Sequence, residues 1–297
     1  MLRYNVSMDF CLDYSNMVKV WMQKNGIKTD KAGWDLWYEF FNLQQKTVRA
    51  RKRKVLFSNE FTCPFEVQAG LDVLVNKFEN GENVVPYLSK DAFNPSKFDG
   101  LLYDWGIYHF HLGSVDLKTG HIKRTGPVLF AWVNDDAVYC INIYSHGKNV
   151  PPPWYKKELI QIIHNNWPEL IKQWKLPELT QLVPHPTDDD YKWARQEHLY
   201  TCIEIAEGTV YAPPGRGLTS SGHSSEVVLL CNSIWNTLKR NELYIKEHIS
   251  SFISVIQART GVFSYSKKLY FKLWYEDKEF YVVDIGSQTA LLKVDLP

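Results

Sequence analysis

Apolar side chains in the first third of the chain recur at the spacing of a helix. Trp34, Trp37 and Phe41 fall on one helical face, and a second apolar stripe runs over residues 64–81, with proline at its start and glycine at its end. Spacings of three and four residues are typical of amphipathic helices, and proline and glycine in these positions mark helix ends. We therefore expect residues 1–98 to be mainly helical.

The pattern changes in the middle of the chain. Residues 108–112 alternate between aromatic or apolar side chains and histidine, and the runs 128–133 and 137–144 are apolar and joined by an Asn-Asp-Asp turn. Alternation and short apolar runs bounded by turn residues indicate strands. We predict an antiparallel β-meander of three strands, followed by a helix that begins near Trp154. Residues 99–183 then form the candidate catalytic core.

A stretch rich in proline and aspartate, residues 184–190, is the best candidate for a domain boundary. Beyond it the pattern predicts a strand from Tyr200 to Ile205, a Gly/Ser-rich loop, a long helix from Ser225 to about Gln257, and a hairpin of strands 269–275 and 279–285. Residues 191–297 are interpreted as a small α+β domain. The predicted fold class is α+β, with a helical N-terminal region, a central antiparallel β-meander with a flanking helix, and this C-terminal domain.

Composition places the chain among ordinary globular proteins. It has 297 residues, of which 45% are apolar and 23% charged. Its five cysteines lie far apart, are odd in number and form no CxxC pair, which argues against a disulfide framework or a zinc knuckle. The sequence contains no run of about 20 apolar residues, the length needed to cross a membrane. We expect a cytoplasmic protein with no membrane contact and no cofactor.

The net charge of +1 conceals a basic segment at residues 46–54. Six cations fall in these nine residues without an acid: Lys46, Arg49, Arg51, Lys52, Arg53 and Lys54. Such a segment is either a solvated turn or a contact to nucleic-acid phosphates, which need cations but no particular sequence. In the second interpretation the RNA-binding residues are Arg49, Arg51, Lys52, Arg53 and Lys54.

The densest chemical signal is a group of histidines in the predicted meander. His109 and His111 share one face of a strand, and Arg124 and His146 flank the next two strands. A neutral imidazole can take the proton of a ribose 2′-hydroxyl, an imidazolium can protonate the leaving oxygen, and arginine can stabilise charge on the phosphate. We therefore predict His109 or His111 as base, His146 as acid and Arg124 as the stabilising cation. Candidates for proton relay or base stacking on the same strands are Tyr108 and Tyr144.

Two other interpretations of the histidines stay open. Each imidazole could be a hydrogen-bonded structural residue. His109 and His111 could also bind a metal ion, with His146 or Asp104 as the third ligand.

The strand pattern resembles a known family. Residues 99–165, with strands reading HFHL, VLFAWV and AVYCINIYSHG, resemble the core of RelE/ParE-type toxins and related small metal-independent ribonucleases. The resemblance implies that His109, His111, Arg124 and His146 lie on a catalytic sheet face and that RNA is the substrate. The whole chain also resembles bacterial proteins of toxin–antitoxin or phage-defence loci. The segment differs from these toxins in its net negative charge and in the length of the chain around it.

A second motif lies between a predicted strand and the long helix. Glycine amides, hydroxyl groups and the start of a helix favour anions, so this loop could bind a phosphate or a partner. It lacks the spacing and the lysine of a P-loop, and a plain loop that caps the helix through Ser224 or Ser225 is the simpler interpretation. The residues concerned are Gly215, Arg216, Gly217, Ser221 and His223.

These observations favour a metal-independent endoribonuclease, a toxin or phage-defence effector, that acts by 2′-hydroxyl transphosphorylation. One alternative is a non-catalytic regulatory protein that binds protein or nucleic acid. A further alternative is a metal-dependent hydrolase centred on His109 and His111. The expected partners are RNA and an inhibitory or complex-forming protein.

Overall fold

The computed structural model describes residues 4–116, 120, 122–147, 150, 152–199, 201–261 and 268–297. Helices and strands are mixed, which confirms the predicted α+β class. The helices are α1 (Phe10–Lys24), α2 (Gly33–Lys46), α3 (Gln68–Asn80), α4 (Gly100–Trp105), α5 (Glu158–Asn166), α6 (Pro168–Ile171), α7 (Asp188–Gln196), α8 (Ser225–Glu247) and α9 (Ile249–Thr260). The strands are β1 (Asn5–Ser7), β2 (Lys54–Phe57), β3 (Ile107–His111), β4 (Pro127–Val133), β5 (Ala137–Ser145), β6 (Ile203–Ile205), β7 (Thr209–Tyr211), β8 (Lys268–Glu276), β9 (Glu279–Asp284) and β10 (Thr289–Val294).

The chain forms two compact units. Unit 1 combines Met1–Phe40 with Val228–Pro297, and unit 2 is Phe41–Val227. This division differs from the three consecutive regions expected from the sequence. The reason is that β1 pairs with β8, so the first residues of the chain belong with the last. Both divisions fall inside helices, α2 and α8.

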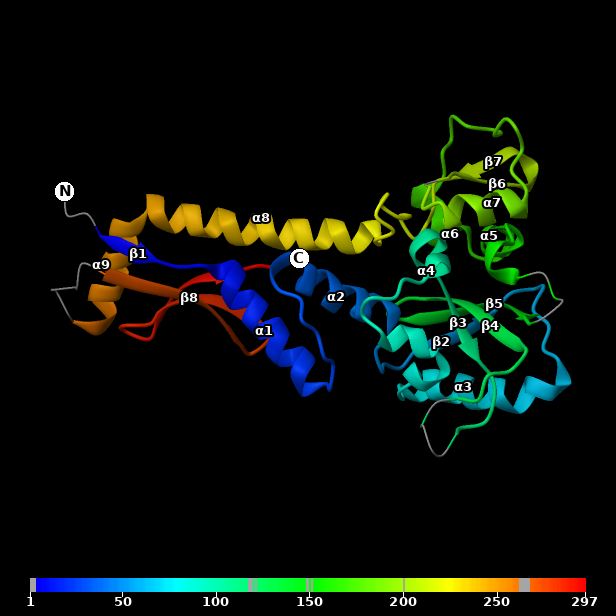
Figure 1. Cartoon of the computed structure of the whole chain (residues 1–297), viewed down its shortest axis with the longest axis horizontal. Helices are drawn as coiled ribbons and strands as arrows, with labels where there is room; N and C mark the ends of the chain where they lie inside the picture. The colour runs from blue at the N-terminus through cyan, green and yellow to red at the C-terminus, as the bar shows by residue number, and fades with distance from the viewer. Residues whose placement is uncertain are drawn as a thin grey trace. The chain divides into compact units, whose positions relative to one another are not determined.

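Unit 2 contains the predicted meander within a four-stranded sheet of order β2-β5-β4-β3 (Figure 1). β3, β4 and β5 are antiparallel neighbours, as the sequence predicts. The fourth strand, β2, pairs in parallel with β5 from Lys54 to Phe57. β2 was not predicted from the sequence because the strand has only four residues. It also adjoins the basic segment, where the charges obscure the apolar pattern.

Two apolar cores cover the two faces of this sheet. One contains Phe110, Leu129 and Cys140 with α3, and the other contains Val128 and Phe130 with α5. α3 approaches the sheet so closely that a Cβ atom on Gly70 would lie 1.8 Å from the carbonyl oxygen of Leu112. The glycine is therefore a packing requirement.

The proline- and aspartate-rich stretch 184–190 lies inside unit 2, so it is not the boundary between the two units. Its last residues start α7, where the Thr187 and Asp190 side chains form a reciprocal capping box. Threonine followed by aspartate three residues later is typical of a helix start as well as of a loop, so the same residues fit both interpretations. The strand expected from Tyr200 is observed as β6 from Ile203; Tyr200 itself lies outside the described residues.

Unit 1 contains a second four-stranded sheet, of order β1-β8-β9-β10 (Figure 1). The predicted hairpin is β8 and β9, and β10 extends it as an antiparallel third strand that the sequence analysis did not anticipate. The predicted long helix is interrupted: α8 ends at Glu247 and α9 begins at Ile249, with His248 between them.

Candidate active site

The three histidines of the predicted cluster lie together on one face of the central sheet. His109 and His111 are two residues apart on β3 and pair with Phe130 and Val128 of β4. His146 directly follows β5, and its amide donates to the carbonyl of Gly126 at 2.8 Å. The ring centroid of His111 lies 6.2 Å from that of His109 and 6.1 Å from that of His146. The alternation of the strand therefore brings the imidazoles together as the sequence suggested.

Trp154, like Asp99 and Arg195, is a residue of this site that was not predicted from the sequence. Its ring centroid lies 4.7 Å from that of His109, 5.4 Å from that of His146 and 5.2 Å from that of Phe130. It belongs to a short 3-10 helix, Pro153–Tyr155, that precedes α5. The signal in the sequence was the tryptophan directly after a proline run, because prolines fix the backbone and can hold a large ring against a sheet.

A pocket of about 330 Å³ lies next to this cluster and is lined by His109. Of the three histidines, only His109 lines it; His111 is 5% exposed and cannot reach a ligand. The other lining residues are Lys46, Ser89, Asp91, Ala92, Phe98, Asp99, Gly100, Leu101, Trp154, Tyr155, Arg195 and Gln196. The pocket thus combines one imidazole with aromatic rings and charges of both signs.

Asp99 is the acidic neighbour of His109. Its Oδ2 lies 3.9 Å from His109 Nδ1, and its Oδ1 accepts the amide of Leu102 at 3.1 Å, which caps α4. The cap fixes the carboxylate, and the second oxygen is left facing the imidazole. At 3.9 Å the two atoms are too far apart for a hydrogen bond, and the carboxylate attracts the imidazole only in its protonated form.

Burial keeps all three imidazoles neutral. It lowers the pKa of His109, against an opposing effect of Asp99, and it lowers the pKa of His111 to about 4, with smaller contributions from the neighbouring histidines and Arg124. Burial also lowers the pKa of His146, assisted by His109 and Arg124. A lowered pKa leaves the imidazole in the unprotonated form that a general base needs, and it also makes that imidazole a weaker base. The lowered pKa values do not favour the imidazolium that His146 would need as the predicted acid.

Three ring nitrogens of the cluster are buried without a hydrogen-bond partner among the described residues: His109 Nδ1, His111 Nδ1 and His146 Nε2. Buried polar atoms are nearly always paired, and an exception calls for an explanation such as a catalytic role or a bound water or ion. This argues against the interpretation of the three histidines as hydrogen-bonded structural residues.

The remaining residues proposed for the chemistry are divided between the two faces of the sheet. Arg124 is exposed and close enough to lower the pKa of each histidine. Tyr144 lies on the histidine side, with its ring 5.8 Å from Phe130. Tyr108 does not, because it alternates to the opposite side, stacks on Phe110 and donates its hydroxyl to the carbonyl of Gln45 at 2.7 Å. Tyr108 is therefore excluded as a relay or stacking residue of this site.

A buried ion pair forms one wall of the pocket. Arg195 donates from Nε and Nη2 to Asp104 Oδ2 at 3.0 and 2.8 Å, and from Nη1 to the carbonyl of Trp154 at 2.5 Å. The guanidinium also lies 4.5 Å from the ring centroid of Trp105. Asp104 is thereby committed to Arg195, which removes it as the third metal ligand considered from the sequence.

The basic segment is partly structural. Lys46 is buried and its ammonium binds the carbonyls of Asp91 and Lys97 at 3.3 and 2.6 Å, and also that of Asn94. Burial lowers the pKa of Lys46 to about 8.

Arg53 is likewise buried, and it donates to the carbonyls of Asn134 and Arg49 at 2.7 and 2.8 Å. Arg51 pairs with Asp135 at 2.9 Å and Asp136 at 3.3 Å. The expectation that Arg53 contacts RNA is therefore wrong, since its guanidinium ties the segment to the turn between β4 and β5. The exposed cations that remain for a phosphate backbone are Arg49, Arg51, Lys52 and Lys54.

The Gly/Ser-rich loop is engaged by the protein itself. The amides of Gly215 and Gly217 donate to the carbonyls of Asp104 and Tyr103, both at 2.9 Å, and thereby satisfy the C-terminal end of α4. A Cβ on Gly215 would lie 2.5 Å from two carbonyl oxygens, so the close approach requires glycine. The amides of Gly215 and Gly217 are therefore not available to a phosphate.

The other residues of the loop stabilise its fold. The amide of Arg216 donates to the carbonyl of Pro213 at 2.9 Å, and its side chain is exposed. Ser221 Oγ lies 3.0 Å from His223 Nδ1. Ser224 accepts the amide of Val227 at 3.5 Å, as expected for a residue that caps α8.

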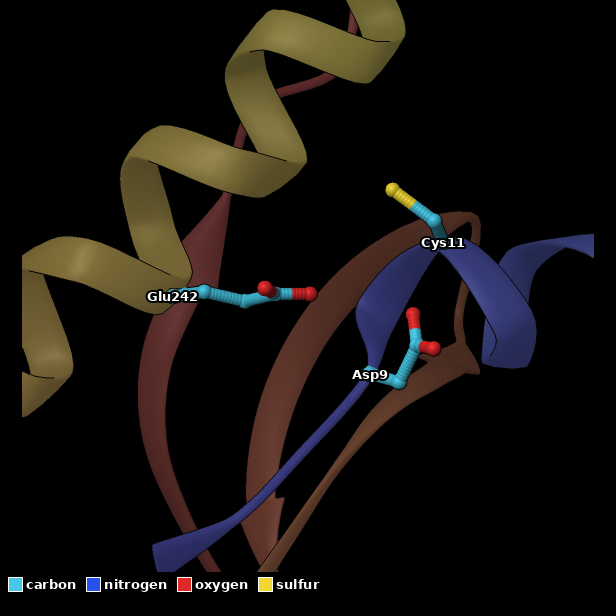
Figure 2. Close-up of side chains that lie close together, drawn as sticks. All are labelled: Asp9, Cys11 and Glu242. Atoms are coloured by element: carbon cyan, nitrogen blue, oxygen red, sulfur yellow. The ribbon is translucent and has the colours of Figure 1, made fainter.

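A possible metal-binding group occurs in unit 1, where Asp9 and Cys11 of the α1 start face Glu242 of α8 (Figure 2). Within the described residues, no other set of three such ligand atoms lies within 4.8 Å of one another, and the histidine cluster does not meet this condition. The group already holds a cation, because Lys239 Nζ lies 2.9 Å from Glu242 and 3.9 Å from Asp9. Glu242 also accepts the amide of Phe10 at 2.8 Å.

The thiol of this group is a poor metal ligand. Burial raises the pKa of Cys11 to about 11, and metal ions bind the thiolate. Asp9, Glu242 and Lys239 therefore form an ion cluster that joins α1 to α8, with the neutral Cys11 thiol beside it.

A comparison of the chain with protein-family models, curated proteins and solved structures found no match. No helix in the described part of the chain is both long and apolar enough to cross a lipid bilayer.

Proposed function

We propose that unit 2 is a metal-independent endoribonuclease of the toxin or phage-defence kind, with His109 as its general base. The observation that carries the proposal is a neutral imidazole that lines a pocket beside a carboxylate, with aromatic rings around it. The same pair of groups, histidine and aspartate, supports proton abstraction from hydroxyls in unrelated enzymes. The sequence resemblance to metal-independent ribonucleases agrees with this chemistry.

In the proposed reaction, His109 takes the proton of a ribose 2′-hydroxyl. The oxygen forms a bond to the adjacent phosphorus, the bond from phosphorus to the 5′-oxygen breaks, and that oxygen takes a proton from water. The products are a 2′,3′-cyclic phosphate and a free 5′-hydroxyl. Asp99 stabilises the imidazolium formed at His109, and Arg124 stabilises the charge on the phosphate oxygens.

The remaining residues position the base and the substrate. His111 is too buried to touch RNA and holds His109 through ring packing. Trp154 and Tyr155 offer ring faces in the pocket on which an unpaired base can stack.

The test is cleavage of a labelled single-stranded RNA of mixed sequence in EDTA. We expect the wild-type protein to produce 2′,3′-cyclic phosphate ends and His109→Ala to lose about 100-fold or more of the rate. His248→Ala is the matched control, because His248 is exposed and lies in unit 1. The proposal is refuted if the wild-type protein cleaves no RNA, or if His109→Ala retains full activity.

A second candidate is binding without cleavage. The pocket carries the carboxylates of Asp91 and Asp99, which repel a phosphate, and this favours a regulatory protein that binds a neutral or cationic group. Expression in a bacterial host separates the two candidates. Growth arrest that is relieved by His109→Ala supports the ribonuclease, whereas arrest or normal growth unaffected by the substitution supports the binding protein.

A further inference from the structure

The sheet of unit 1 exposes a face that carries aromatic rings and lysines. Along β8, Leu269, Phe271 and Leu273 are buried, whereas the residues between them are exposed. Because side chains alternate in a strand, the exposed residues at even positions, from Lys268 to Glu276, lie on the other face of the sheet. Among them are Tyr270, which is 52% exposed, and Trp274, which is 51% exposed.

The neighbouring strands continue this face. Trp274 pairs directly with Tyr281 of β9, and Tyr281 pairs with Lys293 of β10. Directly opposed residues of antiparallel strands point to the same side, with Cβ atoms about 5 Å apart. Tyr270 lies four residues before Trp274 on the same strand, about 13 Å away at a rise of about 3.3 Å per residue. Trp274 and Tyr281 thus form a row across the sheet, and Tyr270 adds a second ring along β8.

At the end of this face near β1, the charged residues are lysines, which are complementary to a polyanion. Lys268 and Lys272 flank Tyr270 and are exposed. The acidic residues of the face, Glu276 and Glu279, lie at the opposite, hairpin end, where Lys293 Nζ binds Glu279 at 2.5 Å. The strand that borders the lysines, β1, contributes only the uncharged polar side chains of Asn5 and Ser7.

We propose that this face binds single-stranded RNA. Stacking of bases on aromatic side chains of a four-stranded sheet, with lysines for the phosphates, is one mode by which unpaired RNA is recognised. The unpaired bases would stack on Tyr270, Trp274 and Tyr281, and Lys268 and Lys272 would contact the phosphates. The choice of RNA over DNA rests on the proposed function of unit 2, whereas the stacking surface itself does not.

The experiment measures binding of the full-length protein to a ten-nucleotide 2′-O-methyl RNA by fluorescence anisotropy. This probe has no 2′-hydroxyl, so the proposed cleavage cannot consume it and a protein that binds but never cleaves still supports this proposal. We expect Trp274→Ala to weaken binding about tenfold and the double substitution with Tyr270→Ala to weaken it further. Lys272→Ala should reduce the slope of log affinity against log salt by about 0.7.

Tyr275→Ala is the matched control. Tyr275 is the next residue of β8 and is 53% exposed, but its ring contacts Phe280 at 4.8 Å on the helix side of the sheet. We expect its binding to equal that of the wild type, and circular dichroism will show whether each variant is folded.

Several results would overturn the proposal. One is unchanged affinity of the folded Trp274→Ala, Tyr270→Ala variant, and another is equal binding of duplex RNA. Binding of single-stranded DNA of the same sequence at least as tightly as RNA would exclude RNA as the ligand. If the variant instead lowers the oligomeric mass and leaves RNA affinity unchanged, the face is a contact between copies of the chain.

Discussion

Replacement of His111 by phenylalanine tests whether the histidine cluster is buried and neutral as the structure indicates. Phenylalanine keeps a planar ring of similar size against His109 and His146, whose centroids lie 6.2 and 6.1 Å away. It removes a titratable imidazole that is only 5% exposed. The substitution therefore changes protonation with little change in packing.

The magnitude follows from the pKa of His111, which burial lowers from 6.5 to about 4. As the pH falls below 6.5, the unfolded chain binds a proton that the native protein does not bind until about pH 4. The stability that His111 contributes is thus present above pH 6.5 and is lost as the pH falls towards 4. At about 1.4 kcal/mol per pKa unit, the loss amounts to about 3 kcal/mol.

The assay is urea unfolding of the wild-type and His111→Phe proteins between pH 7 and pH 4.5, followed by circular dichroism. Carboxylates titrate in both proteins, so only the difference between them is interpreted. We expect the variant to gain about 2 kcal/mol or more relative to the wild type across this range. His248→Phe, an exposed position on the other unit, should show no such gain. A constant difference between the wild-type and His111→Phe proteins at all pH values would refute the description of the cluster as buried and neutral.

Three further comparisons test the scaffold. Arg195→Met should lower the free energy of unfolding by about 3–5 kcal/mol, since it leaves a buried carboxylate without its partner; urea unfolding at pH 7 measures it, and a loss below 1 kcal/mol would contradict the buried pair. Gly70→Ala should destabilise by at least about 2 kcal/mol because its Cβ meets the Leu112 carbonyl, and an unchanged melting temperature would contradict the close packing of α3 on the sheet. In the basic segment, Arg53→Gln should destabilise the protein, whereas Lys52→Gln should leave stability within about 0.5 kcal/mol; equal effects would show that burial does not separate the two residues.

The sequence predicted best those elements whose apolar period is uninterrupted. β4 and β5 are continuous apolar runs, and a strand of any register places His109 and His111 on one face. His146 follows β5, so its place beside them depends on the pairing of β3, β4 and β5. The C-terminal end of α3 was also predictable, since Gly81 closes the helix with a φ of 74°.

The misses share a physical cause, which is that their determinants are distant in the sequence. β2 is a strand because β5 offers it a partner edge, and its own four residues carry little signal. The charge of Arg53 suggested solvent, but carbonyls of the β4–β5 turn satisfy it in the interior. The Gly/Ser-rich loop resembled an anion site because glycine amides can bind either an anion or the carbonyls at the end of a helix. Only the structure shows that they bind the carbonyls at the end of α4.

The pairing of β1 with β8 has a consequence for synthesis on the ribosome. Asp13, in the first turn of α1, accepts the amide of Leu273 across 260 residues of chain. Unit 2 is complete in sequence at Val227, so it can fold while the chain is still growing, whereas β1 and α1 must wait for β8 to be translated. During that interval the apolar face of α1, with Phe10, Val18 and Met22, has no β8 to cover it. The nascent chain therefore has a window in which a chaperone would find its binding site on α1 and not in unit 2.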